Sequence, residues 1–337
     1  VGGLDWTGSQ VNLATGSAGG GSGRQPGSAF KTVVLTEAVR QGISLDSRFL
    51  DTGTIVIPEA DDGEDWTVSN YGGTGPGVID LVSATASSSN TVYAQLIQEV
   101  GPRSVSLLAA DLGVTSDLQP VPSLTLGTQE VSVLDMAAAY SVIATGGERH
   151  DVHSIASIES LDGTLDWNPS YGSERVLSPQ EASLITSALV TVVESGTGTR
   201  AALDGVPVAG KTGTTQNAGD AWFVGFTPKF TTAVWVGFPD AVRPMQGLLG
   251  YDEITGGSVP AELFSTYLGA VPDPGGGGTF DLPTDRPGRV IGADLVDPTV
   301  PPDTTLPPDT TVPTETTGLP ETTVAPETTV APPVSYT

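Results

Sequence analysis

Hydrophobic and polar positions follow two periods along the first 270 residues. Apolar residues recur every three or four positions in stretches that predict helices at 29–41, 78–87, 91–100, 103–112, 132–145, 179–193 and 260–268. Shorter runs rich in β-branched and aromatic residues predict strands at 153–159, 206–212, 221–226 and 231–237. Helices followed by closely spaced strands predict an α+β fold with a largely antiparallel sheet flanked by helices.

Capping signals mark several helix ends. Ser178-Pro179-Gln180-Glu181 is a capping box with proline at the first helical position, so a helix should begin there. Gly42, Gly101 and Gly113 follow other apolar-periodic stretches, where glycine commonly ends a helix.

The composition changes near residue 270. About half of the 27 prolines come after it, together with the tetraglycine at 275–278. From Pro301 a six-residue Pro/Thr/acid repeat begins, which carries too little apolar surface to offset the entropy of ordering. We therefore expect a folded domain at 1–270, a Gly/Pro-rich linker at 271–297 and a disordered repeat tail at 298–337.

Charge and rare residues exclude several function classes. The chain has 13 Lys and Arg against 39 Asp and Glu, a net charge of −26, which argues against nucleic acid or an anionic membrane surface as the partner. It has no Cys and only two His, His150 and His153, so we expect no disulfide, no metal site and no cofactor.

Membrane anchoring is not expected within this chain. No apolar run approaches the length of about 18 residues that spans a bilayer, so we expect the chain as given to be soluble. The opening VGGLDW is typical of a strand end running into a turn, and we expect further sequence before Val1.

The first candidate motif is Ser28-Ala29-Phe30-Lys31, which follows a turn-forming RQPG segment and opens a predicted helix. Residues i and i+3 share a helix face, so the Lys31 amine can approach the Ser28 hydroxyl. An amine with a lowered pKa can activate a serine nucleophile, and helix N–H groups favour the developing negative charge. The alternative is a capping serine beside a solvated lysine.

The second motif, Ser88-Ser89-Asn90, lies between two predicted helices. There a hydroxyl and an amide can point together into a cleft, although Ser and Asn are also ordinary capping residues.

The third motif, Lys211-Thr212-Gly213-Thr214, allows two interpretations. Residues 205–212 match the phosphate-binding loop G-x-x-x-x-G-K-[ST], but a turn-rich segment and a strand follow instead of a helix. We favour an edge strand of a cleft, on which the Lys211 cation and the Thr212 and Thr214 hydroxyls hold a carboxylate. An exposed strand lysine without function is the remaining alternative.

The three motifs occur in the order S-x-x-K, S-x-N, K-T-G, a set typical of serine β-lactamases and penicillin-binding proteins. The segments RQPGSAFK, SSNTVYAQL, EVSVLDMAAAYSVIATGG, VVESGTGTRAAL and PVAGKTGTTQNAGDAWFVGFTP also resemble the transpeptidase domain of class A penicillin-binding proteins. The resemblance covers most of residues 1–270 and implies a β-lactamase/D,D-peptidase-like fold.

The resemblance implies a role for each motif residue. Ser28 is the acyl nucleophile, Lys31 its general base and Ser88 a proton relay, while Asn90 binds the donor peptide. Lys211, Thr212, Gly213 and Thr214 bind the terminal carboxylate of the substrate. The backbone N–H groups of Ser28 and Thr214 form the oxyanion hole.

The implied activity is a serine D,D-transpeptidase that cross-links peptidoglycan stem peptides, takes lipid-linked precursor as substrate and is acylated by β-lactams. The resemblance places this activity at the extracytoplasmic face of the bacterial membrane, and we expect an N-terminal membrane anchor before Val1. The resemblance also implies a glycosyltransferase domain and first sheet strands, which we expect to precede Val1 and to be missing from this chain. A D,D-carboxypeptidase, a β-lactamase-like hydrolase and a β-lactam sensor without turnover are the alternatives.

Overall fold

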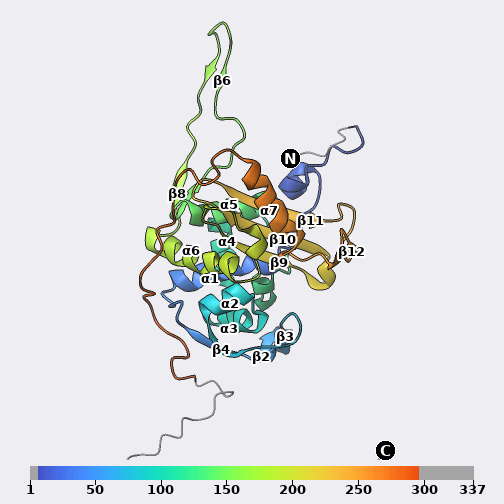
Figure 1. Ribbon diagram of the computed structural model, residues 1–337, viewed down its shortest axis with the longest axis vertical. Coiled ribbons are helices and arrows are strands. Elements are labelled where there is room, and N and C mark those ends of the chain that lie inside the picture. Colours follow the sequence, from blue (N-terminus) through green and yellow to red (C-terminus); the bar gives the residue numbers. More distant parts are fainter. Residues whose placement is uncertain (1–6, 296–337) are drawn as a thin grey trace, which may run out of the picture. The chain divides into compact units, whose positions relative to one another are not determined.

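The structure is a computed structural model that describes residues 7–295 (Figure 1). Its α-helices are α1 (Lys31–Arg40), α2 (Leu81–Ser87), α3 (Asn90–Val100), α4 (Pro102–Asp111), α5 (Val133–Ala144), α6 (Pro179–Glu194) and α7 (Val259–Ala270). Short 3₁₀ helices are η1 (Leu13–Gly19), η2 (Gly27–Phe30), η3 (Pro122–Leu126), η4 (Thr199–Ala201) and η5 (Gln216–Ala218).

The strands pair only in antiparallel ladders within the described residues. The largest sheet has the order β11 (Thr231–Gly237), β10 (Asp220–Phe226), β9 (Ala209–Thr214). Two-stranded ladders join β1 (Arg48–Asp51) to β4 (Gly77–Asp80), β2 (Thr54–Asp61) to β3 (Glu64–Ser69), β5 (Glu148–His150) to β8 (Ser173–Arg175), β6 (Ile158–Glu159) to β7 (Asp166–Trp167), and β12 (Gln246–Leu248) to β13 (Tyr251–Glu253).

Side-chain alternation along β10 gives the main sheet two buried faces. Trp222 and Val224 belong to the main core, whereas Phe223 packs in a second cluster with Phe264 and Leu268 of α7. Successive side chains of a strand point to opposite faces, so β10 is buried along its whole length. The predicted α+β fold with an antiparallel, helix-flanked sheet is confirmed.

Helix α1 runs through the centre of the domain. Every residue from Lys31 to Val39 is buried, although the helix contains Thr32, Thr36 and Glu37. The polar side chains have partners: the Thr32 and Tyr140 hydroxyls lie 2.6 Å apart, and Thr36 donates to the Thr32 carbonyl. Burial on all sides holds α1, and with it Lys31, in one position.

Two predicted elements near the cleft differ in extent. The helix predicted at 78–87 begins at Leu81, because residues 77–80 pair with β1 and the Asp80 carboxylate accepts from Ser83 N–H. The helix predicted at 29–41 is the 3₁₀ turn η2 followed by α1. The predicted helices at 91–100, 103–112, 132–145, 179–193 and 260–268 are confirmed within a few residues.

Two strand predictions were also partly wrong. The strand predicted at 206–212 begins at Ala209, since Pro207 has no N–H for a ladder, and continues to Thr214. The strand predicted at 153–159 is reduced to β6, which pairs only with β7 in a hairpin that projects from the body (Figure 1). Its apolar residues are exposed, so alternation there does not indicate a core strand.

Residues after α7 contain no further helix or strand up to 295, yet they contact the folded part. Ser44 N–H donates to the Arg289 carbonyl and Arg48 N–H to the Ile291 carbonyl. The predicted repeat tail at 298–337 lies outside the described residues. None of the helices in residues 7–295 combines the length and apolar character of a membrane span.

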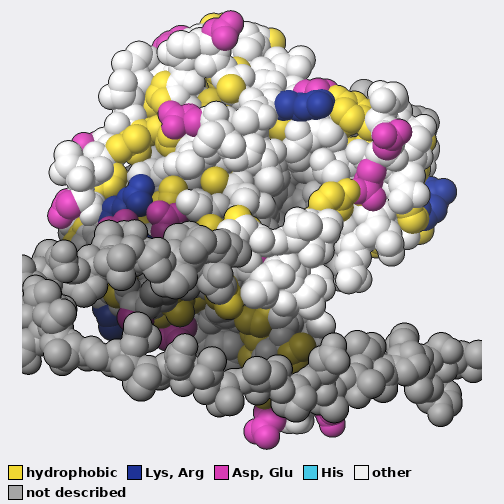
Figure 2. Space-filling model, turned by 60° about the horizontal axis from the view of Figure 1, so that its bottom comes forward, with side chains coloured by type: hydrophobic (Ala, Val, Ile, Leu, Met, Phe, Trp, Pro, Cys, Tyr) yellow, Lys and Arg dark blue, Asp and Glu magenta, His cyan; other side chains and the backbone are white. Residues whose placement is uncertain are grey.

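Figure 2 shows one face of the described residues, on which acidic side chains lie scattered with a few basic ones among them.

Candidate active site

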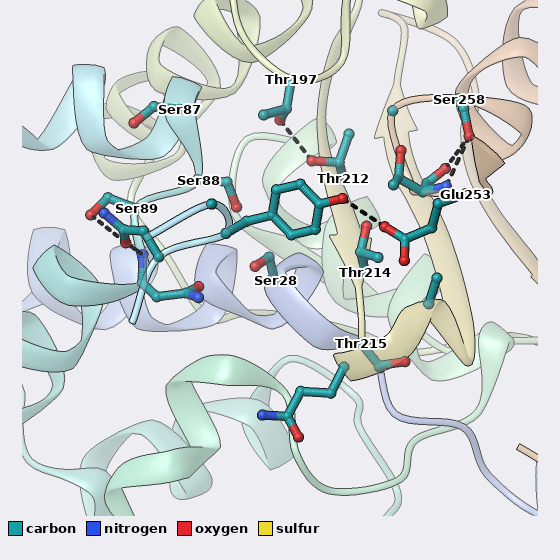
Figure 3. Close-up of a pocket in the computed structure, with 18 of the residues that line it drawn as sticks. Ser28, Ser87, Ser88, Ser89, Thr197, Thr212, Thr214, Thr215, Glu253 and Ser258 are labelled. Carbon is teal, nitrogen blue, oxygen red and sulfur yellow. Dashed lines mark hydrogen bonds between the residues drawn. The ribbon is translucent and has the colours of Figure 1, made fainter. Parts of the chain in front are cut away.

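A cleft of about 1010 Å³ lies between the α2–α3 junction and strand β9. Five of the predicted site residues line it: Ser28, Ser88, Asn90, Thr212 and Thr214. In Figure 3, Ser28 lies between the segment that carries Ser88 and the strand that carries Thr212 and Thr214. Segments far apart in the sequence thus meet around one hydroxyl.

Ser28 is held by close backbone packing between η2 and β9. Gly27 has φ +56°, and a Cβ there would lie 2.8 Å from the Thr214 carbonyl oxygen. On Gly213 a Cβ would lie 2.1 Å from the Pro26 carbonyl oxygen and 3.1 Å from Ala29 N. Glycine is required at both positions because any side chain would separate the Ser28 turn from the strand.

Lys31 lies beneath the cleft with no exposed surface. Its Nζ donates to the Ser88 carbonyl at 2.6 Å, to Asn90 Oδ1 at 2.7 Å and more weakly to Ser88 Oγ at 3.4 Å. Burial lowers the pKa of Lys31 well below its usual value, nearby Lys211 lowers it further, and Asp51 raises it. The solvated-lysine alternative is wrong, and an amine in this setting favours the neutral, basic form.

The Ser88–Asn90 segment makes a tight turn between two helices. Ser88 ends α2 in a left-handed conformation with φ +61°, which is uncommon for residues other than glycine. Ser89 is the N-cap of α3 and accepts from Val92 N–H, while Asn90 is the first residue of α3. The turn aims the Ser88 carbonyl and the Asn90 amide oxygen at the same lysine.

Lys211 is fully buried on the edge strand β9. Burial lowers its pKa to about 7, and its Nζ donates weakly to the carbonyl and hydroxyl of Thr212. The exposed-lysine alternative is therefore wrong. The phosphate-loop interpretation is wrong as well, because β9 continues through residues 211–214 where a phosphate loop would start a helix.

The two threonines of this motif differ in their contacts. The Thr212 hydroxyl lies 2.7 Å from the Thr197 hydroxyl, and Thr214 Oγ1 accepts from Gly256 N–H at 3.0 Å. Since Gly256 uses only a lone pair of Thr214, the hydroxyl hydrogen of Thr214 is left to donate to a ligand in the cleft.

Two cleft residues that sequence reasoning missed hold the Ser88–Asn90 segment. Asn70, after β3, accepts from the N–H groups of Asn90 at 2.7 Å and Thr91 at 3.1 Å. Asp51, at the end of β1, is 2% exposed and accepts from the Asn70 side chain at 2.6 Å. An asparagine in the turn-rich run SNYGG is a weak signal, and no local pattern marks Asp51.

Further missed residues also line the cleft. Tyr71, beside Asn70, donates to Glu253 of β13 at 2.6 Å, and this bond joins the two walls of the cleft (Figure 3). Thr197 and Arg200 lie in the segment VVESGTGTRAAL, whose small-residue turn was a usable signal. Arg200 is paired with Glu262.

The arrangement is suited to acyl transfer without a metal. It offers a hydroxyl, two buried amines with lowered pKa values, and hydroxyl and backbone N–H donors beside one cleft. Among the described residues, no cluster of three or more His, Asp or Glu side chains is placed to hold a metal ion.

Comparison with known families gives one match over most of the domain. The model of the penicillin binding protein transpeptidase domain matches residues 22–240. Penicillin-binding protein 1A of Neisseria meningitidis serogroup A is 34% identical over 275 residues, which are 80% of this chain and 33% of that protein. The protein of the same name from Aquifex aeolicus is 37% identical over 238 residues, which are 71% of this chain and 32% of that protein. The chain thus spans about one third of the length of these curated relatives.

Solved structures confirm the predicted fold class. The penicillin-binding protein PonA1 from Mycobacterium tuberculosis superposes with a TM-score of 0.72 at 27% identity, covering 93% of this chain and 81% of that one. PonA1 in complex with penicillin V gives a TM-score of 0.67 at 27% identity, covering 82% of this chain and 75% of that one.

Proposed function

The chain belongs to the penicillin-binding protein transpeptidase family, and from that premise we propose that it is a serine D,D-transpeptidase. Its substrates are peptidoglycan stem peptides, presented on glycan or on lipid-linked precursor outside the bacterial cytoplasmic membrane. β-Lactams acylate the same serine, which agrees with the penicillin V complex of PonA1. The observation that carries the proposal is the buried Lys31 amine, bonded to Ser88 and Asn90 below the cleft that Ser28 lines.

Acylation begins with attack of Ser28 Oγ on the carbonyl carbon of the penultimate D-Ala. The Ser28 proton passes to Lys31 Nζ, whose lowered pKa increases the share of neutral amine that can accept it. The backbone N–H groups of Ser28 and Thr214 stabilise the oxyanion, a role supported by the close packing of Gly27 against Thr214.

Collapse of the tetrahedral intermediate breaks the C–N bond and releases D-Ala. The proton on Lys31 reaches the leaving amine through the Ser88 hydroxyl, which lies 3.4 Å from Nζ. An amine of a second stem peptide then attacks the acyl-Ser28 ester, giving a new amide and restoring the Ser28 hydroxyl.

The other motif residues hold the donor peptide. Asn90 binds the peptide backbone, and Thr212 and Thr214 donate to the terminal carboxylate. Gly213 keeps the strand close to Ser28. Lys211 Nζ lies within 3.4 Å of Thr212 and acts through the positive charge of its protonated form, which attracts the carboxylate and lowers the Lys31 pKa.

A penicillin-labelling experiment tests this assignment. Wild-type protein should gain one penicilloyl group on the peptide containing Ser28, and Ser28→Ala and Lys31→Ala should abolish labelling. Ser22→Ala, a serine outside the cleft, is the matched control and should label normally. Persistent labelling of Ser28→Ala would refute the nucleophile.

The fate of the acyl group separates transpeptidase from hydrolase and sensor. A stem-peptide donor with an amine acceptor should yield a cross-linked product and free D-Ala. Release of D-Ala without cross-linking would identify a carboxypeptidase, and rapid loss of the penicilloyl group a β-lactamase. Stable acylation by penicillin without any D-Ala release would identify a sensor.

A further inference from the structure

Asp51 and Asn70 line the cleft but take no part in the proposed chemistry. We propose that they are positioning residues for acylation, which hold the Ser88–Asn90 segment and, through it, the amine of Lys31. The inference rests on the proposed function, because it assumes that Lys31 is the base for Ser28.

Asn70 acts as a cap for the first turn of α3. Its Oδ1 accepts from the backbone N–H groups of Asn90 and Thr91, and Ser89 Oγ lies 3.4 Å away. N–H groups in the first turn of a helix have no partner within the helix, so an outside acceptor fixes where the helix begins. Asn90 Nδ2 also donates to the Ser69 carbonyl at 2.8 Å, which orients the Asn90 amide oxygen toward Lys31.

Asp51 accepts hydrogen bonds from both Asn70 and the first turn of α3. A single oxygen, Asp51 Oδ1, accepts from Asn70 Nδ2 at 2.6 Å, from Thr91 Oγ1 at 2.8 Å and from Gly53 N–H at 3.2 Å. Burying a carboxylate is costly unless donors satisfy it, so three donors on one oxygen indicate a built arrangement. Through its bond with Thr91, Asp51 therefore contacts the same first turn of α3 that Asn70 caps.

The hydrogen bonds of Asp51 and Asn70 lead, through the Ser88–Asn90 segment, to the amine of Lys31. Lys31 Nζ donates to Asn90 Oδ1 at 2.7 Å and to the Ser88 carbonyl at 2.6 Å, and both acceptors belong to the segment that Asn70 holds. Movement of the α3 start would therefore shift the two acceptors of Lys31 together. Misplacement of a reacting group by about 1 Å can cost about 100-fold in rate.

Charged and titratable groups surround Lys31 on several elements. Lys211 faces it from β9 and Asp51 from β1, while Nζ lies 5.4 Å from the centre of the Tyr93 ring on α3. Further along α1, Thr32 bonds to Tyr140 of α5, and Glu37 is paired with Arg40. Asp51 raises the pKa of Lys31 and Lys211 lowers it, so removing the Asp51 charge lowers that pKa.

Asp51→Asn tests the effect of the Asp51 charge, because asparagine keeps the shape of the side chain. The amide oxygen can accept all three bonds now made to Oδ1, but the negative charge is gone. The limiting rate of penicillin acylation should stay within about threefold of wild type. Because Lys31 must be neutral to accept the Ser28 proton, the fall in rate on acidification should move to lower pH. An unchanged pH profile would overturn the electrostatic part of the proposal.

Asn70→Ala tests the geometric part. The limiting acylation rate should fall about 100-fold, whereas the dissociation constant of the non-covalent penicillin complex should rise by a smaller factor, because Asn90 is displaced but Thr212 and Thr214 remain in place. Gln95→Ala is the matched control: Gln95 joins α3 to β1 by donating to the Leu50 carbonyl, and it also donates to the Thr91 carbonyl within α3, so its hydrogen bonds do not include Asn70 or Lys31. It should lower the melting temperature without slowing acylation more than about threefold.

The outcomes distinguish the two proposals. If wild-type protein is not acylated at Ser28, the proposed function fails. If wild-type protein is acylated but folded Asn70→Ala reacts at the wild-type rate, or slows no more than Gln95→Ala, the positioning role fails. A slow Asn70→Ala together with a shifted Asp51→Asn profile supports both parts.

Discussion

Replacing Gly213 with alanine tests how closely the nucleophile turn must approach the sheet. The added Cβ would lie 2.1 Å from the Pro26 carbonyl oxygen, whereas Cβ contacts shorter than 3.0 Å are essentially never seen. Pro26 and Ala29, which both contact this position, flank Ser28 on the chain. The Ser28 turn and β9 must therefore separate by about 1 Å, which increases the distance between Ser28 and Thr214.

A displacement of this size has two expected costs. Overpacking between backbone segments destabilises a protein by about 1–3 kcal/mol. Misplacing Ser28 relative to the oxyanion donors should slow penicillin acylation about 100-fold, which corresponds to about 2.7 kcal/mol in activation free energy. We expect the second-order acylation rate, followed with a fluorescent penicillin, to fall by that factor in protein that still melts cooperatively.

Gly269→Ala is the matched control. Gly269 lies in α7 with ordinary φ, and the nearest atom to a new Cβ is Leu203 Cδ2 at 4.0 Å. Alanine in a helix is favoured over glycine by about 0.5–1 kcal/mol, so this variant should be slightly stabilised and acylated at the wild-type rate. Acylation of folded Gly213→Ala within about threefold of wild type would refute the argument from close approach.

Three further predictions follow from other contacts. Lys211 has a folded pKa of about 7, below the ordinary 10.5, so between those pH values the folded protein binds fewer protons than the unfolded chain. The free energy of unfolding should therefore rise with pH over this range. Lys211→Met should flatten the rise, measured by urea unfolding at pH 7 and 9.5. An equal pH slope in the variant would contradict this. Tyr71→Phe and Glu253→Ala each remove the bond across the cleft, so each should speed acylation about two- to fivefold, and the double variant should gain no more; unchanged rates would show that the bond does not restrict access. Ser178→Ala removes half of the α6 capping box and should cost about 1 kcal/mol in urea unfolding without slowing acylation, and a loss of acylation would contradict a purely local role.

Several features could be predicted from the sequence because their causes are local. The α6 start at Ser178 depends on residues within one turn of helix, and the structure has both bonds of the capping box. Strands β10 and β11 are dense in aromatic and β-branched residues and joined by a short turn, so neighbouring sequence also predicts their pairing. The three motifs, read in order, indicated which segments meet at the cleft.

Elements that depend on distant partners were missed or misplaced. Strand β4 was predicted as helix because Val78 and Ile79 continue the apolar pattern of α2, and only pairing with β1 makes them extended. The apolar alternation at 153–159 predicted a sheet strand, but β7 is its only partner, and the hairpin lies away from the core. A local pattern does not record which segment is available to pair.

The sequence by itself determined the residue types of the site and their order along the chain. Tertiary structure alone decided that Lys31 and Lys211 are buried, and burial is what lowers their pKa values from those of solvated amines. It also decided that Asp51 and Asn70 reach the start of α3 from other strands. Solvation and hydrogen-bond partners are properties of the space around a side chain, and that space is filled by segments far away in the sequence.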